Sequence, residues 1–321
     1  MNAVFTSVLK EEMASFMEFI KPSLVDSRRY QHTLSELDAF LHAQGLAEKK
    51  LEGQLLGRWL DGFKVHLLTK KGRLSRVKRF SAYLSTLGIA ASLPELPRGC
   101  SEFKPYVFSR DEMALIFETA DDFMLAASGS RLAAEFPVLL RILYGCGLRL
   151  GEAEALAWDD IDLAAGVITV KAAKNQKQRL VPMGDELARI LGLYKKASCL
   201  GAQAGGFLFA KDNGQRRSKG AHWYIFNRIL TELGIKNPQN TRYGSRGPCI
   251  HSLRHTFTLH SLLKAESEGR GFMETVPFLS TYLGHEGLME TDKYLKARHE
   301  LYTASHKAIA DYTHDVFPQE V

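Results

Sequence analysis

The chain has 321 residues, of which 45% are hydrophobic and 24% are charged, and this length and composition predict about two packed domains. A net charge of +6 and a pI near 9.0 favour a polyanionic partner such as nucleic acid. The cysteines show no CxxC pairing, and no apolar run approaches the ~20 residues of a membrane span. These features argue against a zinc ribbon, a disulfide framework, export and membrane insertion, so we expect a soluble protein of a reducing cytoplasm.

Three amphipathic helices are predicted at the start of the chain. Residues 5–20 carry apolar side chains at helical spacing, and a second helix begins at Asp26 or Ser27 and ends at Gly45. A third spans about residues 48–66. Together they predict a small helical bundle.

A fourth predicted helix is strongly basic. Its apolar positions run from Leu74 to Leu87, and they are preceded and interleaved by six cations within ten residues, namely Lys70, Lys71, Arg73, Arg76, Lys78 and Arg79. One face can pack while the other neutralises several phosphates, so we predict DNA binding here. The alternative is a solvated surface helix.

A linker follows, because Pro94, Pro97, Gly99 and Pro105 cannot continue a helix. The predicted domains are therefore a helical, DNA-binding domain over residues 1–92, a linker over 93–106, and a second domain over 107–321 with a tail from about residue 297. Two DNA-facing lobes joined in this way could close around a duplex.

The second domain is predicted to be mostly helical with a small antiparallel sheet. A helix begins near Ser109, which Glu112 completes as a capping box. The β-rich runs 167–170 and 179–182 flank a polar, lysine-rich segment and predict a hairpin. Further helices are predicted over residues 132–144, 151–157, 185–196 and 221–233 and from His251 onwards. The fold class is mostly α, with an all-α first domain and an α+β second domain.

The cations of the second domain suit a phosphodiester. Arg149 follows a Gly-Cys-Gly turn, and His251 and Arg254 lie three residues apart, so on a helix they share one face. Arginines donate in bidentate fashion to phosphate oxygens, and pre-placed donors stabilise the extra negative charge of a phosphorane-like transition state. Lys174 and His285 could join them, which predicts metal-free phosphoryl transfer.

Tyr294, nine residues after His285, is the candidate nucleophile. A phenol with a pKa near 10 is weak at neutral pH, but neighbouring cations favour the phenolate. Lys174, in the hairpin, could protonate the leaving 5′ oxygen as a general acid.

Several motifs in fixed order resemble the tyrosine recombinases, the family of phage integrases and Xer-like site-specific recombinases. They are Gly147-Leu148-Arg149-Leu150-Gly151-Glu152, Lys177-Gln178-Arg179-Leu180-Val181-Pro182, His251-Ser252-Leu253-Arg254-His255-Thr256-Phe257, and Leu283-Gly284-His285 followed by Tyr294. The resemblance covers about residues 107–296. The first domain resembles the family's core-binding domain only in pattern and position.

The resemblance implies a site-specific DNA recombinase, integrase- or transposase-like. Arg149 and Arg254 would clamp the scissile phosphate, Lys174 would be the leaving-group acid, and Tyr294 would form a 3′-phosphotyrosyl intermediate. The two histidines, His251 and His285, would bind phosphate oxygens or relay protons, and Glu152 would support the site from behind. The family rejoins strands without ATP, metal or another cofactor, so we expect none here.

The implied partners are double-stranded DNA with inverted half-sites and further copies of the chain, as a tetramer on two DNA sites, with accessory proteins in some systems. We expect a nucleoid-associated protein. Because the chain begins close to its first helix, an Xer-like, integron-like or transposon-borne enzyme is favoured over an integrase with an extra arm-binding domain. The tail after Tyr294 is expected to pack on a neighbouring subunit, the alternative being its own domain.

Some assignments stay open. Residues 261–282, several more than shorter family members carry there, are interpreted as a surface loop between helices. Lys171 and Lys177 also lie near the hairpin, although counting back from Arg179 favours Lys174. Taken alone, Arg149 is expected to form a salt bridge with Glu152.

Other functions and other nucleophiles remain as alternatives. A type IB topoisomerase has the same chemistry, and a catalytically silent DNA-binding regulator is possible in another class. Tyr282 or Tyr302 could replace Tyr294. The spacing of His251 and His255 resembles a zinc site, but an arginine at 254 and a serine in place of the glutamate base argue against zinc hydrolysis.

Overall fold

The computed structural model describes residues 5–20, 27–65, 67–95, 105–127, 129–171, 178–198, 206–217, 219–236 and 247–284. The chain divides into two compact units, Met1–Glu102 (unit 1) and Phe103–Val321 (unit 2). Each unit has a hydrophobic core of its own. Among the described residues, no helix combines the length and the apolar character needed to cross a membrane.

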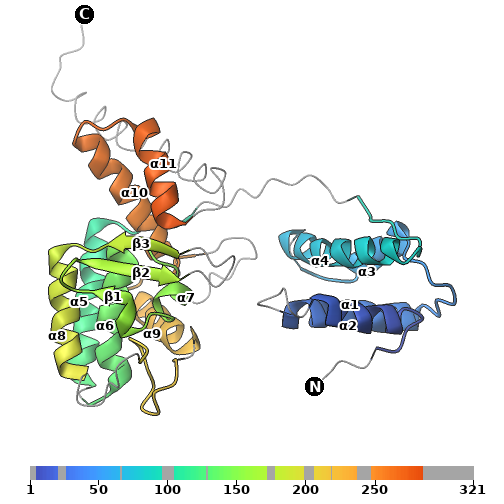
Figure 1. Ribbon diagram of the computed structural model, residues 1–321, viewed down its shortest axis with the longest axis horizontal. Coiled ribbons are helices and arrows are strands. Elements are labelled where there is room, and N and C mark those ends of the chain that lie inside the picture. Colours follow the sequence, from blue (N-terminus) through green and yellow to red (C-terminus); the bar gives the residue numbers. More distant parts are fainter. Residues whose placement is uncertain are drawn as a thin grey trace, which may run out of the picture. The chain divides into compact units, whose positions relative to one another are not determined.

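Unit 1 is a helical bundle. Its helices are α1 (Lys10–Ile20), α2 (Ser27–Ala43), α3 (Gly53–Asp61) and α4 (Leu67–Thr86), as Figure 1 shows. The predicted apolar stripes form the core, where the rings of Phe16 and Phe80 lie 5.3 Å apart and both side chains are fully buried. The helices therefore form because each presents one apolar face to the others.

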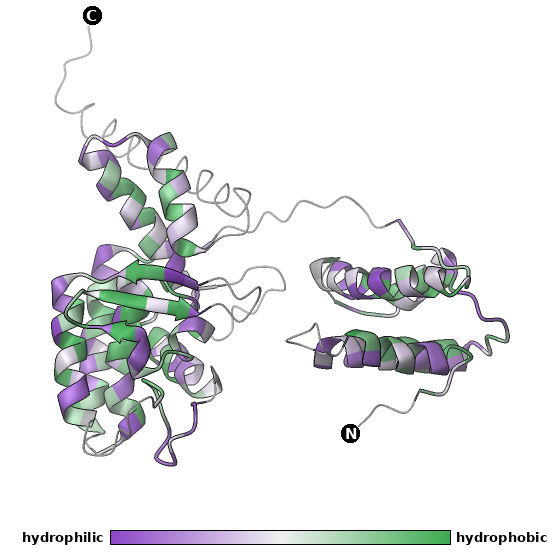
Figure 2. Cartoon of the chain, in the orientation of Figure 1, coloured by the Kyte–Doolittle hydropathy of each residue, from purple (hydrophilic) through white to green (hydrophobic). Residues whose placement is uncertain are grey.

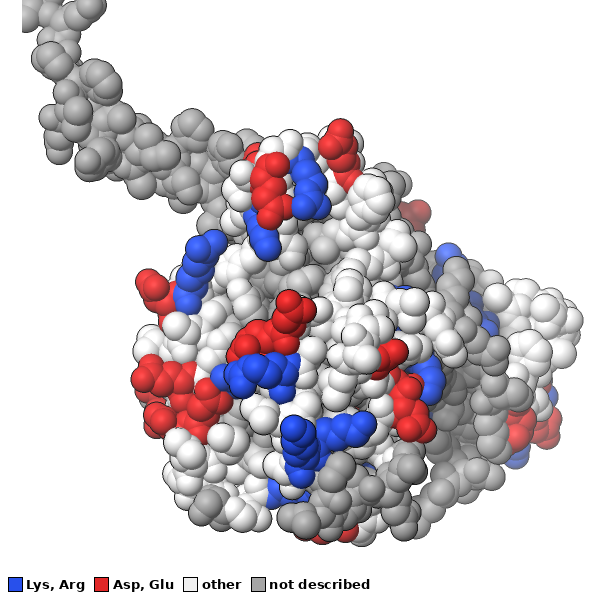
Figure 3. Space-filling view, turned by 60° about the vertical axis from the view of Figure 1, so that its left-hand side comes forward, with Lys and Arg blue, Asp and Glu red and all other residues white. Residues whose placement is uncertain are grey.

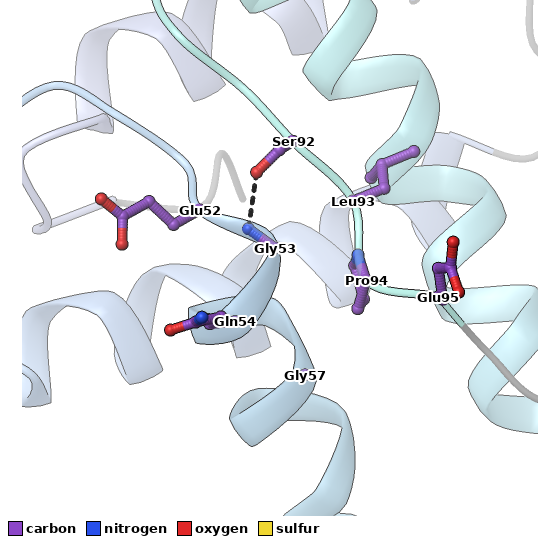
Figure 4. Close-up of a pocket in the computed structure, with 8 residues that line it drawn as sticks. All are labelled: Glu52, Gly53, Gln54, Gly57, Ser92, Leu93, Pro94 and Glu95. Carbon is purple, nitrogen blue, oxygen red and sulfur yellow. Dashed lines mark hydrogen bonds between the residues drawn. The ribbon is translucent and has the colours of Figure 1, made fainter.

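The predicted third helix is too long at both ends. Residue Leu51 instead pairs with the chain after α4, since its amide donates to the Ala90 carbonyl (2.9 Å) and its carbonyl accepts from the Ser92 amide (2.8 Å). The Ser92 hydroxyl then accepts from the Gly53 amide at 2.7 Å, so a residue 39 positions away caps the helix (Figure 4). The same two segments line a shallow pocket with Glu52, Gln54, Gly57, Leu93, Pro94 and Glu95.

Unit 2 places helices around a small sheet. The helices are α5 (Arg110–Ala126), α6 (Arg131–Gly145), α7 (Leu150–Ala153), α8 (Asp185–Ser198), α9 (Lys219–Glu232), α10 (Ser252–Ser267) and α11 (Phe272–Leu283). The predicted capping box is present, because the Ser109 hydroxyl accepts from the Glu112 amide (3.0 Å) and the Glu112 carboxylate from the Ser109 amide (2.7 Å). The helix predicted over 151–157 is shorter than expected, and Ala157 instead forms a bridge with Phe207.

The sheet has three antiparallel strands in the order β1 (Ile161–Asp162), β2 (Val167–Lys171) and β3 (Gln178–Pro182). The predicted hairpin is β2–β3, paired from Val167 with Pro182 to Lys171 with Gln178. The two-residue strand β1 was not predicted, since so short a run carries no periodicity. Figure 2 shows the hydrophobic residues that predominate in β2. The predicted fold class, mostly helical with a small antiparallel sheet, is confirmed.

The sequence-based interpretation of residues 261–282 as a surface loop is wrong, because most of these residues are helical. Helix α10 continues to Ser267, and α11 begins at Phe272 and lies beside it (Figure 1). The pair forms because Leu262 of α10 packs with Val276, Leu279 and Leu283 of α11 in a small apolar cluster. Most of the additional length is therefore packed helix that leads directly to Leu283.

Candidate active site

A tight turn after α6 presents Arg149. Gly147 has a φ of +60°, and a Cβ there would lie 2.3 Å from a ring carbon of Phe257, so the turn requires glycine. Arg149 follows as the residue that caps the N-terminus of α7. Its side chain is 40% exposed, which leaves it accessible to a ligand.

The carboxylate of Glu152 is the centre of the site. It accepts from the Arg149 amide (2.9 Å) and guanidinium (3.1 Å), and from two nitrogens of Arg179 (3.1 and 2.8 Å). Burial alone would raise the pKa of Glu152, but the hydrogen bonds from Arg179 and from the Arg149 backbone lower it to about 2. The salt bridge expected for Arg149 alone therefore exists, within a larger cluster.

Arg254 approaches the same carboxylate from α10. Its Nη1 donates to the Gly147 carbonyl (2.7 Å) and lies 4.0 Å from a Glu152 oxygen, and its Nη2 donates to the Leu283 carbonyl (2.8 Å). The side chain is only 2% exposed. The guanidinium therefore joins the turn after α6 to the end of α11.

His251 and Arg254, which the sequence predicted to share one helix face, differ in burial. His251 precedes α10 as its N-cap and is exposed, whereas Arg254, in the first turn, is buried. The imidazole of His251 packs edge-on against that of His255 at 4.7 Å. The two predicted ligands differ in burial because the carbonyls of Gly147 and Leu283 draw the guanidinium inward.

Arg179 was part of a quoted motif but received no role from the sequence. In addition to its two contacts with Glu152, its Nε donates to the Tyr282 carbonyl at 2.9 Å. Backbone acceptors carry no signal in a sequence. Its position in the second strand of a basic, polar hairpin, three residues before Pro182, was the one available hint, and that hint did not identify its partners.

Three predicted residues, Lys174, His285 and Tyr294, lie outside the described residues, as do the alternatives Lys177 and Tyr302. Their roles stay predictions. Lys171 is described, and it forms an ion pair with the buried Asp160 that raises its pKa. A higher pKa makes Lys171 a weaker proton donor to a leaving group.

The alternative nucleophile Tyr282 is poorly suited to attack. Burial raises the pKa of its phenol, and its ring stacks on Phe257 at 5.6 Å. The phenolate that attack requires is therefore disfavoured. This observation argues against one of the two competitors of Tyr294.

The predicted DNA-binding cations of α4 fall into two groups. Arg73 makes two hydrogen bonds with Glu36 (3.1 and 3.0 Å) and lies over the Phe63 ring, and Arg76 donates to Thr33 (2.7 Å). Lys70 contacts Asp61 at 3.4 Å, and Lys71 is half-buried. Lys78 and Arg79 are exposed. Contacts within unit 1 thus orient half of the predicted set.

In the parts of the chain that the structure describes, no group of three or more His, Cys, Asp or Glu side chains could hold a metal ion. The polar centre of unit 2 is instead a cluster of arginines around one carboxylate. Such an arrangement binds oxyanions rather than cations.

Known proteins share both the sequence and the fold. Residues 107–300 match the phage integrase family. The chain is 30% identical to the tyrosine recombinase XerC of Xanthomonas axonopodis pv. citri, over 85% of this chain and 77% of the relative. It is 28% identical to the putative integrase/recombinase y4rB of Sinorhizobium fredii, over 71% and 74%.

Among solved structures, the XerH site-specific recombinase bound to a palindromic difH substrate gives a TM-score of 0.69 at 17% identity, with 91% of this chain and 83% of that chain covered. The lambda integrase bound to DNA gives 0.61 at 16% identity, with 87% and 91% covered. These likenesses show the fold, and the family match shows the membership. The chain belongs to the phage integrase family of tyrosine recombinases, enzymes that cleave and rejoin DNA strands.

Proposed function

We propose that this chain recombines DNA at specific sites through a 3′-phosphotyrosyl intermediate on Tyr294, without ATP or a metal ion. The observation that carries the proposal is the cluster of Arg149, Arg179 and Arg254 around Glu152. The DNA-bound relatives named above support DNA as the substrate.

The cluster has the charge that phosphoryl transfer requires. Three guanidinium groups and one carboxylate leave a formal excess of two positive charges beside the accessible Arg149. Because the pKa of Glu152 is about 2, its negative charge is present throughout the neutral range and fixes the arginines. Donors held in place before the reaction stabilise the extra charge of the transition state at little reorganisation cost.

The proposed step is a transesterification. The phenolic oxygen of Tyr294 attacks phosphorus as its proton leaves to a base, and the bond from phosphorus to the 5′ oxygen breaks. Lys174 gives that oxygen a proton, so a 5′-hydroxyl strand leaves. One phosphodiester replaces another, and the reverse attack by a 5′-hydroxyl rejoins a strand with no external energy source.

Residues 1–92 of unit 1 are proposed as the core-binding domain, residues 93–106 as a linker across the boundary of the two units, and residues 107–321 of unit 2 as the catalytic domain. The exposed Lys78 and Arg79 of α4 are proposed as the phosphate contacts of unit 1, and the other four predicted cations are less exposed. The face of unit 2 that Figure 3 shows carries interspersed acidic and basic side chains. This mixture of charges disfavours that face as the main phosphate-binding surface. We further propose a tetramer on two sites with inverted half-sites.

The test is to trap the covalent complex on a genomic fragment library, denature the protein and sequence the attached 3′ ends. The wild-type chain is expected to yield adducts at a defined sequence, and Tyr294→Phe none. The matched variant Tyr302→Phe is expected to retain the adduct.

An adduct that persists in Tyr294→Phe would disprove the nucleophile. Adducts spread over all sequences, together with relaxation of a supercoiled plasmid that lacks the recovered site, would favour a topoisomerase. No adduct with any variant would favour a silent DNA-binding protein.

A further inference from the structure

We propose that Arg179 is a positioning residue, which ties the end of α11 to Glu152 and thereby holds both Arg254 and Arg149 in their places for phosphate binding. This inference rests on the proposed function of the same site. Arg179 belongs to β3, and its three contacts reach two other elements, α7 and α11.

All three guanidinium nitrogens of Arg179 donate hydrogen bonds. Nη1 and Nη2 grip both oxygens of Glu152, at 3.1 and 2.8 Å, in the bidentate geometry that lysine cannot reproduce. Nε points to the Tyr282 carbonyl at 2.9 Å. The side chain is only 15% exposed, so solvent screens these contacts little.

Arg254 and Arg179 donate hydrogen bonds to neighbouring carbonyls at the end of α11. The Tyr282 carbonyl accepts from Arg179, and the Leu283 carbonyl accepts from Arg254 at 2.8 Å. Two arginines therefore fix two successive peptide groups at the end of α11. Without Arg179, the Leu283 carbonyl loses its neighbouring anchor, and the orientation of Arg254 is less restricted.

The backbone after these carbonyls is fitted to Arg179. Gly284 has a φ of +66°, and a Cβ there would lie 3.1 Å from Nη1 of Arg179. The chain thus turns directly over the guanidinium, in a conformation that favours glycine. The next residue in the sequence is His285, so the contact precedes the part of the chain that carries the predicted nucleophile.

Arg149 depends on Arg179 through the shared carboxylate. Glu152 accepts from both side chains and from the Arg149 amide. Removal of Arg179 leaves Glu152 with only the donors of Arg149, so the rotamer of the carboxylate is less restricted. Small displacements of positioning groups reduce reaction rates strongly, on the order of 100-fold per ångström.

The experiment compares Arg179→Ala with Arg141→Ala. Arg141 is a matched control, since it also makes two hydrogen bonds to one carboxylate, Asp121 (2.9 and 2.6 Å), and one to a carbonyl, that of Pro137 (3.2 Å). It joins α6 to α5 away from the cluster. The single-turnover rate of adduct formation and the half-saturating DNA concentration are measured on the duplex recovered by covalent trapping, together with melting temperatures.

Arg179→Ala is expected to lower the rate at saturating DNA by about 100-fold with half-saturation little changed, and Arg141→Ala to leave both near wild type. Arg179→Lys keeps the charge but lacks the planar, two-pronged donor group, and its rate is expected to lie between those of Arg179→Ala and Arg141→Ala. If Arg179→Ala does not fold, the rate of Arg179→Lys tests the positioning role. Equal rates for Arg179→Ala and Arg141→Ala would overturn the inference.

A second measurement needs no DNA. Hydrogen exchange of the backbone amides of residues 281–284 is expected to accelerate in Arg179→Ala and not in Arg141→Ala, because the end of α11 has lost its anchor. Unchanged exchange in this segment would overturn the positioning role. Absence of any adduct with the wild-type chain would count against the proposed function, while the exchange experiment would still decide the role of Arg179.

Discussion

Two carboxylates two residues apart, Glu152 and Glu154, lie in opposite environments at one short helix. Glu152 faces the candidate active site, is 15% exposed and receives hydrogen bonds from Arg149 and Arg179. Glu154 faces the interior and is fully buried, with the Nδ1 of His222 at 2.9 Å from one of its oxygens. Helix α7 is therefore held by polar contacts on both sides.

The two environments differ in the hydrogen bonds that the carboxylates receive and in the direction of their pKa shifts. The interior cluster also contains Glu135, which Arg217 contacts at 2.6 Å and whose carboxylate lies 4.0 Å from the Nε2 of His222. One Glu154 oxygen and that Nε2 are buried atoms without a hydrogen-bond partner. Burial raises the pKa of Glu135, in contrast to the lowered pKa of Glu152. Glu135 also receives two hydrogen bonds from Arg217, so the comparison shows that the balance decides: burial outweighs the donors at Glu135, and the donors outweigh burial at Glu152.

The largest effect on stability is expected for His222→Leu. The change leaves Glu154 buried without its imidazole, and removal of one partner from a buried pair costs about 3–5 kcal/mol. The free energy of unfolding of the variant, measured by urea denaturation, should fall by that amount. The double variant His222→Leu, Glu154→Leu is expected to recover most of the loss, since neither member of the pair is then buried without its partner. A double variant as unstable as the single would contradict this account.

Local sequence predicted the outline of the fold, and tertiary contacts determined the rest. The α5 cap was predictable because Ser109 and Glu112 are three residues apart and satisfy each other. The start of α3 was not, because Ser92 caps it from across unit 1. The pairing of α11 with α10 was missed for the same reason, since it depends on the contact of Leu262 with Val276.

The candidate site divides in a similar way. Residue type and order singled out Arg149 and Arg254, because few other chemistries combine two arginines with histidines and a tyrosine, and the resemblance to tyrosine recombinases added Glu152. The burial of Arg254 and the role of Arg179 could not be predicted, since their acceptors are the backbone carbonyls of Gly147, Tyr282 and Leu283. Any residue type supplies a carbonyl, so the sequence does not show which one will be used.

The second-largest effect on stability is expected at Glu152, where the free energy of unfolding should depend on pH in the acid range. Its folded pKa of about 2 lies below its ordinary value of 4.5, so its stabilisation is complete above about pH 4.5 and is lost as the pH falls toward 2. The difference corresponds to about 3 kcal/mol. Glu152→Gln should therefore be less stable than wild type at neutral pH and should lose less stability on acidification. Parallel pH profiles of the urea midpoint for the two proteins would contradict the assignment.

A smaller effect of opposite sign is expected for Glu135. Because burial raises its folded pKa above 4.5, the folded state binds a proton more readily than the unfolded state, and this contribution to stability declines as the pH rises above 4.5. Glu135→Gln should remove that decline, so the variant should gain stability relative to wild type as the pH increases. A difference that is constant with pH would mean that the carboxylate has an ordinary pKa in the folded state.

The smallest effect on activity is expected at Lys171, a cation that contacts a third buried carboxylate, Asp160. Since this contact raises the pKa of Lys171 and its side chain is 60% exposed at the end of β2, we expect neither proton donation nor a large share of stability from it. Lys171→Ala should form the covalent adduct at nearly the wild-type rate, whereas Lys174→Ala should be slower by about 100-fold or more, as for loss of a general acid.

A DNA substrate with sulfur in place of the leaving 5′ oxygen does not need a proton from a general acid, and it should therefore restore cleavage to Lys174→Ala. If Lys171→Ala were the slow variant that this substrate rescues, the proton donor would be Lys171, and the ion pair with Asp160 would have to open during the reaction.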